Sequence, residues 1–201
     1  MVCLFYNILA IVAAMYSLFD VNYFVRLLFT TLWRRIIPRK KKRFSEDIRT
    51  YGFCTTNDVD FFMTHMNNAR FLRELDFSRI DFYHRTGLYE GVVSRKATVL
   101  QGATTVRYRK PLPIFAFYQV TTRLVYCDDK AIYLEHKFIT LSDNFVRAIA
   151  ISKQNITGLE VTVSELISIV DPESLQLEAP EDLKHWLEYI NASSEKLKKS
   201  D

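Results

Sequence analysis

Residues 57–70 read NDVDFFMTHMNNAR and bring together side chains that acid–base chemistry uses. The carboxylates can take up protons or attack an electrophile, and the imidazole can orient water or donate a hydrogen bond. A helix that starts at the doubled asparagine would add unpaired N–H groups and the positive end of its dipole. The stretch therefore predicts a place where a polarised oxygen could be held beside a carboxylate.

The helix that must position these groups is predicted to run from the two asparagines to a glycine, over residues 67–87. Asparagine is a good N-cap residue, and glycine is favoured just beyond a helix end. Three apolar side chains lie along one line of such a helix: Phe71, Leu75 and Phe82. Most charged residues fall on the other side, whereas Asp76 and Arg79 point towards the apolar half.

Strand-like segments follow the helix, rich in Val, Ile, Thr, Tyr and Phe, at residues 97–110, 117–127, 131–140 and 144–154. The Asp128–Lys130 connection indicates a tight antiparallel hairpin. Two further helices are predicted, over 164–170 and 180–199, with Pro180 at a helix start. One long helix followed by an antiparallel meander indicates an α+β domain whose curved sheet wraps that helix.

The N-terminal segment, residues 1–43, differs from the rest. Residues 1–19 carry no charge and would form a helix roughly 28 Å long, close to the hydrocarbon thickness of a bilayer. Asp20 interrupts this run, an apolar stretch continues through Trp33, and the basic sequence RRIIPRKKKR follows. We expect a membrane anchor with its basic side in the cytoplasm. A cleaved signal peptide and a buried core helix are the alternatives.

The net charge of +4 is unevenly divided. Residues 1–43 hold eight basic residues against one acid (net +7), and residues 44–201 hold 19 against 22 (net −3). The folded part thus has no basic excess, so nucleic-acid binding is not expected. Three scattered cysteines form neither a disulfide framework nor a metal motif, and we expect no metal and no cofactor.

Several stretches resemble a known family. DVDFFMTHMNNARFLRELDF is similar to the D-x-D-x-x-x-H-V-N-N motif of hotdog-fold acyl thioesterases. YRKPL, TTRLVYCDDKAIYLEHKF and HWLEYINASS look like the thioesterase superfamily member 6 family. The resemblance implies a hotdog domain, a homodimer, action on acyl-CoA or acyl-carrier thioesters, and an endoplasmic reticulum membrane location. We therefore expect an anchor at 1–43, a hotdog domain at 44–160 and a helical extension at 161–201.

The resemblance also implies roles for individual residues. Asp60 would act as base or nucleophile, His65 would orient water, and Asn67 would help to fix the substrate carbonyl. The amides near Met66 and Asn68 would bind the carbonyl oxygen, and Asp76 matches an acid that related thioesterases carry on the helix. Four residues separate Asp60 from His65 where three are usual, so we expect a displaced carboxylate.

Structural roles compete with these assignments. The asparagines could only cap the helix, His65 could be a hydrogen-bonded structural residue, and Asp58 and Asp60 could be surface acids. The alternative function is a catalytically inactive hotdog protein that binds acyl lipid or a membrane partner. A secreted or luminal location is the alternative to a cytoplasmic domain, and the sequons at Asn155 and Asn191 would report on it.

Overall fold

The computed structural model describes residues 2–36, 40–173 and 177–198 of the 201-residue chain. The chain divides into two compact units, residues 1–40 and 41–201. Because all three buried apolar clusters are made of residues from Phe44 onwards, the second unit has a core of its own.

The N-terminal unit contains two helices, α1 (Val2–Leu18) and α2 (Val21–Ile36). Asp20 separates them because its carboxylate accepts a hydrogen bond from the Tyr23 N–H group at 3.1 Å and so caps α2. In the described part of the chain, neither helix alone has the length and apolar composition to cross a membrane. The two helices meet that test together, with a bend of 83° between them. The single N-terminal membrane helix that we predicted is therefore not confirmed.

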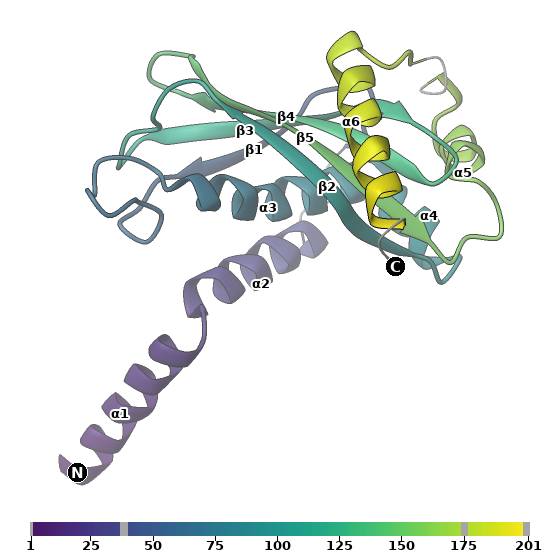
Figure 1. The fold of residues 1–201 in the computed structure, drawn as a ribbon. Coiled ribbons are helices and arrows are strands. Elements are labelled where there is room, and N and C mark those ends of the chain that lie inside the picture. Colours follow the sequence, from purple (N-terminus) through teal and green to yellow (C-terminus); the bar gives the residue numbers. More distant parts are fainter. Residues whose placement is uncertain (1, 37–39, 174–176, 199–201) are drawn as a thin grey trace. The chain divides into compact units, whose positions relative to one another are not determined.

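The second unit is built on a five-stranded antiparallel sheet (Figure 1). Its strands are β1 (Ile48–Phe53), β2 (Thr98–Tyr108), β3 (Phe117–Cys127), β4 (Ala131–Thr140) and β5 (Val146–Thr157). The order across the sheet is β1-β3-β4-β5-β2. The predicted meander is thus confirmed for β3 to β5 only, because β2 crosses over to pair with β5 and β1 was not predicted.

Helix α3 (Asn68–Thr86) lies along one face of this sheet, as Figure 1 shows. The Asn67 side chain accepts a hydrogen bond from the Ala69 N–H group, and Gly87 ends the helix with φ at 82°. This left-handed conformation is one that glycine adopts without steric penalty. The predicted bounds of the helix are therefore confirmed, although a short helix, α4 (Leu88–Val93), follows at once.

The interior between α3 and the sheet is divided by polar side chains. One apolar cluster surrounds Phe82 and another surrounds Phe71, and both are closed to solvent. Between them His136 is fully buried, with Nδ1 2.9 Å from Thr122 Oγ1 and Nε2 2.9 Å from Ser152 Oγ. Burial, and to a smaller extent the nearby Arg79 cation, lowers the pKa of His136 to about 3. His136 is thus a neutral residue of the core.

Gly52 on β1 makes room for a buried hydrogen bond. It is paired with Tyr118 on β3, and a Cβ atom at position 52 would lie 2.3 Å from the Tyr118 ring. The Tyr118 hydroxyl donates a hydrogen bond to the Glu74 carboxylate on α3 at 2.7 Å. The glycine therefore lets the ring cross from the sheet to the helix.

The other face of the sheet is partly covered by α6 (Glu181–Lys198), which follows α5 (Val163–Val170). Leu183, Trp186 and Leu187 of α6 pack with Val125 and Tyr133. Figure 1 shows α6, in yellow, lying across the sheet on the side away from α3. The C-terminal segment is thus packed on the outer face of the same sheet.

The two sequons differ in their surroundings. Asn155 lies within β5, paired on one side with Ala131 of β4 and on the other with Leu100 of β2. Its side chain packs against the Gly102 backbone, where a Cβ atom would meet Asn155 Nδ2 at 2.6 Å. Asn191 lies on α6 and is exposed.

Candidate functional site

Asp60 and His65 face each other at the base of a short loop. The bridge between Val59 and Met66 brings the two chain segments together, and the Asp60 N–H group donates to the His65 carbonyl at 3.0 Å. Asp60 Oδ1 lies 3.7 Å from His65 Nδ1. Both side chains keep partial contact with solvent, 18% for Asp60 and 34% for His65, so a ligand or water can reach them.

The extra residue in this loop is accommodated by one unusual backbone conformation. Met63 has φ at 54°, in the left-handed region that non-glycine residues rarely occupy. Its N–H group donates to the Asp60 carbonyl at 3.0 Å, and the Thr64 N–H group donates to Asp60 Oδ1 at 3.3 Å. These hydrogen bonds therefore close a turn between Asp60 and His65.

Asp58, the other acid of the motif, has a structural place. Its Oδ2 atom accepts hydrogen bonds from the Thr55 N–H group at 2.8 Å and the Thr55 hydroxyl at 2.7 Å. Oδ1 lies 3.8 Å from Arg70 Nε, and the Arg70 guanidinium also donates to the Asn57 carbonyl. Asp58 thus ties the loop to α3 and is not directed at a ligand.

Most backbone N–H groups at the start of α3 already have acceptors. The Met66 N–H group donates to the Leu112 carbonyl at 2.8 Å, and the Asn67 N–H group donates to the Asp58 carbonyl at 2.8 Å. Within the described ranges, the Asn68 N–H group has no protein acceptor. We expected the Met66 amide to bind a carbonyl oxygen, but that amide is occupied and the Met66 side chain is fully buried. The available donor is Asn68.

Asp76 is not part of this group. It lies eight residues beyond Asn68 on the same helix, about 12 Å along its axis. Its carboxylate pairs with Arg79, whose guanidinium also donates to Gln101 on β2. Asp76 thus lies on the β2 side of α3, at the edge of the sheet. Asp60 and His65 lie close together within a single copy of the chain, whereas Asp76 lies apart from them.

Two residues that the sequence did not indicate also hold the site. The Tyr108 hydroxyl, at the end of β2, donates to the Asn68 carbonyl at 2.8 Å, and burial raises the pKa of Tyr108. The Thr64 hydroxyl lies 2.8 Å from His65 Nδ1, closer than Asp60 does. Tyr108 fixes the helix start, and Thr64 competes with Asp60 for the imidazole. The sequence indicated neither role, because the Tyr108 contact joins residues 40 positions apart and the Thr64 contact depends on the conformation of the loop.

Exposed aromatic and apolar side chains surround the loop. Phe61 and Phe62 at its tip are 93% and 77% exposed, and Met63 follows them. The loop is joined to residues 113–115 by the bridge between His65 and Pro113 and by the hydrogen bond from the Ile114 N–H group to the Thr64 carbonyl. The exposed rings near these two segments are those of Phe53, Phe61, Phe62, Phe115 and Phe117. An apolar surface therefore adjoins the polar group.

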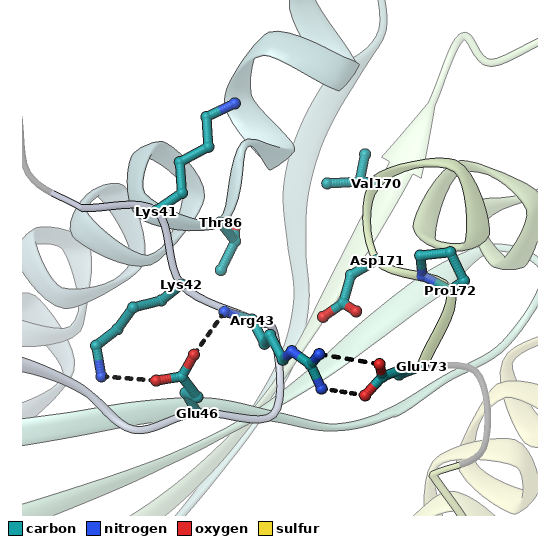
Figure 2. Close-up of a pocket in the computed structure, with 9 residues that line it drawn as sticks. All are labelled: Lys41, Lys42, Arg43, Glu46, Thr86, Val170, Asp171, Pro172 and Glu173. Carbon is teal, nitrogen blue, oxygen red and sulfur yellow. Dashed lines mark hydrogen bonds and ion pairs between the residues drawn. The ribbon is translucent and has the colours of Figure 1, made fainter.

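A hollow of about 530 Å³ lies elsewhere, at the C-terminal end of α3 (Figure 2). Its charged groups are engaged with one another: Arg43 pairs with Glu173 through both guanidinium ends, and Lys42 Nζ lies 3.1 Å from Glu46. Asp171 accepts a hydrogen bond from the Phe44 N–H group at 3.0 Å, and the Phe44 side chain is fully buried. We interpret the hollow as the place where residues 41–46 are fastened to the domain.

No group of three or more His, Cys, Asp or Glu side chains within the described residues could hold a metal ion. The Cys54 thiol beside the loop is buried, and burial raises its pKa to about 11, with Asp58 adding to the effect. It is therefore a protonated core residue. The polar groups described at this site are the Asp60 carboxylate, the His65 imidazole and the Asn68 N–H group.

The chain is similar to known proteins of one family. Residues 54–187 match the model of the thioesterase-like superfamily. The chain is 50% identical over 191 residues to Protein THEM6 of Drosophila melanogaster, covering 95% of this chain and 97% of that one. It is 37% identical over 188 residues to Protein THEM6 of Danio rerio, covering 92% and 90%.

Solved structures share the fold at low sequence identity. YbaW, a probable thioesterase from Escherichia coli, has a TM-score of 0.56 at 17% identity and covers 65% of this chain and 98% of its own. SAV2348 from Staphylococcus aureus, solved in complex with CoA, has a TM-score of 0.55 at 14% identity, with coverages of 72% and 96%. These similarities confirm the predicted hotdog-like fold of the second unit.

Proposed function

Because this chain belongs to the thioesterase-like superfamily, and within it to the Protein THEM6 family, we propose that it hydrolyses acyl-CoA thioesters at the start of α3. The proposal rests on one observation above all. Asp60 and His65 lie 3.7 Å apart beside Asn68, whose N–H group has no acceptor in the described part of the chain. A base, an orienting imidazole and an oxyanion donor are the groups that acyl transfer to water requires.

The reaction proceeds by attack of water on the thioester carbonyl. As the water oxygen bonds to the carbonyl carbon, Asp60 takes a proton from that water. The carbonyl oxygen becomes negatively charged. The Asn68 N–H group and the positive end of α3 stabilise that charge. The carbon–sulfur bond then breaks, and the proton held by Asp60 passes to the departing thiolate. His65 orients the water through its ring.

The acyl group fits the surface that adjoins the loop. Phe61, Phe62 and Met63 are exposed to water in a single chain, which is unfavourable for side chains of this size. A fatty or aromatic acyl chain, or a second copy of the chain, would cover them. This supports a lipid or aromatic thioester as the substrate.

A non-catalytic function is the second candidate. The Asp60 carboxylate already accepts a hydrogen bond from the Thr64 N–H group, and the Thr64 hydroxyl occupies His65 Nδ1 more closely than Asp60 does. A site held in this way could bind an acyl lipid or a membrane partner through the exposed rings without hydrolysis. Binding of acyl-CoA without thiol release would favour it.

We also propose that the protein is a homodimer joined at β2. This edge strand is eleven residues long, and a long unpaired edge strand tends to pair with another chain. Pairing of two such edges would bring a second α3 beside the first. Asp76, which lies on the β2 side of its helix, would then face the second chain.

We propose further that α1 and α2 bind lipid and hold the protein at the endoplasmic reticulum membrane, with the domain in the cytoplasm. The uncharged residues 1–19 and the basic residues that follow α2 support this proposal. Release of the domain as a secreted or luminal protein is the alternative. Glycosylation of the chain in cells would contradict a cytoplasmic domain.

The test uses residues 41–201, because this unit has a core of its own, to which Phe44 belongs. Thiol release from a panel of acyl-CoA esters is measured for this fragment and for Asp60→Asn. Turnover that is lost in the variant, with the fold unchanged, supports the proposed function. Turnover that persists in the variant, or CoA-ester binding with no turnover at all, contradicts it.

A further inference from the structure

Three cationic side chains surround one phenyl ring at the end of the sheet. The guanidinium carbons of Arg109 and Arg147 lie 5.0 Å and 5.2 Å from the centre of the Phe145 ring, and Lys110 Nζ lies 5.1 Å from it. The backbone holds them together, since the N–H groups of Arg109 and Lys110 both donate to the Arg147 carbonyl, at 2.8 Å and 3.2 Å. The three charges are therefore fixed near one another by the fold.

Only one of these charges is balanced by an acid in the described structure. Arg147 pairs with Asp143, which also accepts a hydrogen bond from the Thr140 hydroxyl. Arg109 donates to the Val146 carbonyl at 3.3 Å, and neither Arg109 nor Lys110 has a carboxylate partner among the described residues. Both are exposed. Like charges held close together repel one another, and an anion bound between them would relieve that repulsion.

The position of this cluster connects it with the helix start. Arg109 and Lys110 directly follow Tyr108, whose hydroxyl holds the Asn68 carbonyl. Their Cα atoms therefore lie within about 4 Å and 7 Å of that of Tyr108. The strand pairing places the end of β2, the start of β5 and the end of β4 at one end of the sheet. The cations are thus close to the proposed hydrolytic site without belonging to it.

We propose that Arg109 and Lys110, together with Arg147, form a phosphate-binding subsite for the nucleotide part of a coenzyme A thioester. The pantetheine arm separates the thioester of such a ligand from its phosphates, which suits an anion site that adjoins the helix start. Guanidinium and ammonium groups bind phosphate oxygens through charge-assisted hydrogen bonds. This inference rests on the proposed function for the identity of the ligand and adds the residues that recognise its phosphates.

The test is equilibrium binding, measured by calorimetry on residues 41–201, with CoA, dephospho-CoA and pantetheine as probes. The variant is Arg109→Gln with Lys110→Gln, and the control is Lys196→Gln with Lys198→Gln on exposed positions of α6, which removes the same charge. We expect the variant to bind CoA about tenfold or more weakly and with a shallower salt dependence, whereas the control binds CoA as the wild type does. Pantetheine binding should be equal in all three proteins.

Three outcomes overturn the proposal: no CoA binding by the wild type, equal weakening in the control, or equal weakening for pantetheine. Vesicles of phosphatidylcholine with one phosphatidylserine in about five lipids test the other source of phosphate. Loss of vesicle binding in the variant with CoA affinity unchanged assigns the cluster to lipid headgroups and also overturns it. Hydrolysis of acyl-pantetheine by a protein that does not bind CoA would overturn the phosphate subsite but leave thioester hydrolysis standing. Failure of the subsite can therefore be distinguished from failure of the proposed function.

Discussion

Asp60 Oδ1 and His65 Nδ1 face each other at 3.7 Å across a four-residue loop, because Met63 turns the chain back. If Asp60 is the base, Asp60→Asn should lower kcat by a factor of about 100 to 10,000, the range that general-base catalysis supplies. The free energy of unfolding should change little, since Asp60 is partly exposed. Thiol release and urea unfolding of the same samples measure the two effects.

Asp58→Asn provides the matched control for this prediction. Asp58 holds Thr55 and Arg70 and does not face the loop interior, so its substitution should weaken the fold by about 1–2 kcal/mol. The fraction of the variant that remains folded should turn over substrate at the wild-type rate. An Asp58 variant as inactive as the Asp60 variant would show that the loop, and not one carboxylate, carries the activity.

Gly52→Ala should destabilise the domain. The added Cβ would lie 2.3 Å from the Tyr118 ring, and displacing that ring breaks its buried hydrogen bond with Glu74. We expect a loss of about 1–3 kcal/mol in the free energy of unfolding, measured by urea denaturation. Gly91→Ala is the control, because its Cβ would meet only side-chain ends, Leu166 at 3.2 Å and Val170 at 3.6 Å, within a helix that favours alanine. Equal losses in both variants would contradict this explanation.

His136 should make the domain less stable in acid. Burial lowers its folded-state pKa to about 3, whereas the unfolded chain binds a proton near the ordinary value of 6.5. Stability is therefore complete above pH 6.5 and falls as the pH drops from 6.5 towards 3, by up to about 1.4 kcal/mol per pH unit.

His136→Gln should remove that part of the pH dependence, because glutamine stays neutral at every pH. Urea unfolding at pH 7, 6, 5 and 4 compares the two proteins, and their difference isolates His136 from the carboxylates that also titrate. Parallel curves for wild type and variant would mean that His136 has the same pKa in the folded and the unfolded protein, which contradicts the prediction.

A dimer joined at β2 should separate when charge is placed on that edge. Leu100→Lys with Thr105→Lys puts lysines at exposed positions of the strand, which should repel the same strand of a second copy. We expect the wild type to sediment as a dimer and the variant as a monomer with weaker activity. Lysines at Asn191 and Ser194 on α6 are the control and should leave the dimer intact. A wild-type protein that sediments as a monomer would contradict the proposed dimer.

Local signals explain which parts of the fold could be predicted. Asn67 and Gly87 bound α3 through their own side-chain and backbone properties, and β3 to β5 have strong strand composition. β1 was missed because IRTYGF contains an arginine and a glycine, and it is a strand only by pairing with β3. The crossing of β2 to the far edge has no local signal either, since it depends on contacts with β5 some fifty residues later.

The contacts among the candidate site residues could not be predicted from the sequence. The sequence indicated Asp60, His65 and a donor at the helix start. It did not indicate that the Leu112 carbonyl takes the Met66 N–H group, 46 positions away along the chain, or that Tyr108 fixes Asn68. It also did not indicate the left-handed conformation of Met63 in the loop between Asp60 and His65. Each difference comes from a long-range contact or from a conformation that residue type alone does not favour.

The position of Asn155 inside β5 affects the stage of folding at which this residue could be glycosylated. Once β5 has paired with β4 and β2, the Asn155 side chain is half-buried and packs against Gly102, which hinders the approach of a glycosyltransferase. An oligosaccharide would be attached there more readily while the new chain is still unfolded. Were the chain made in a secretory lumen, occupancy at Asn155 would measure the delay before the sheet closes, whereas Asn191 would record the compartment alone.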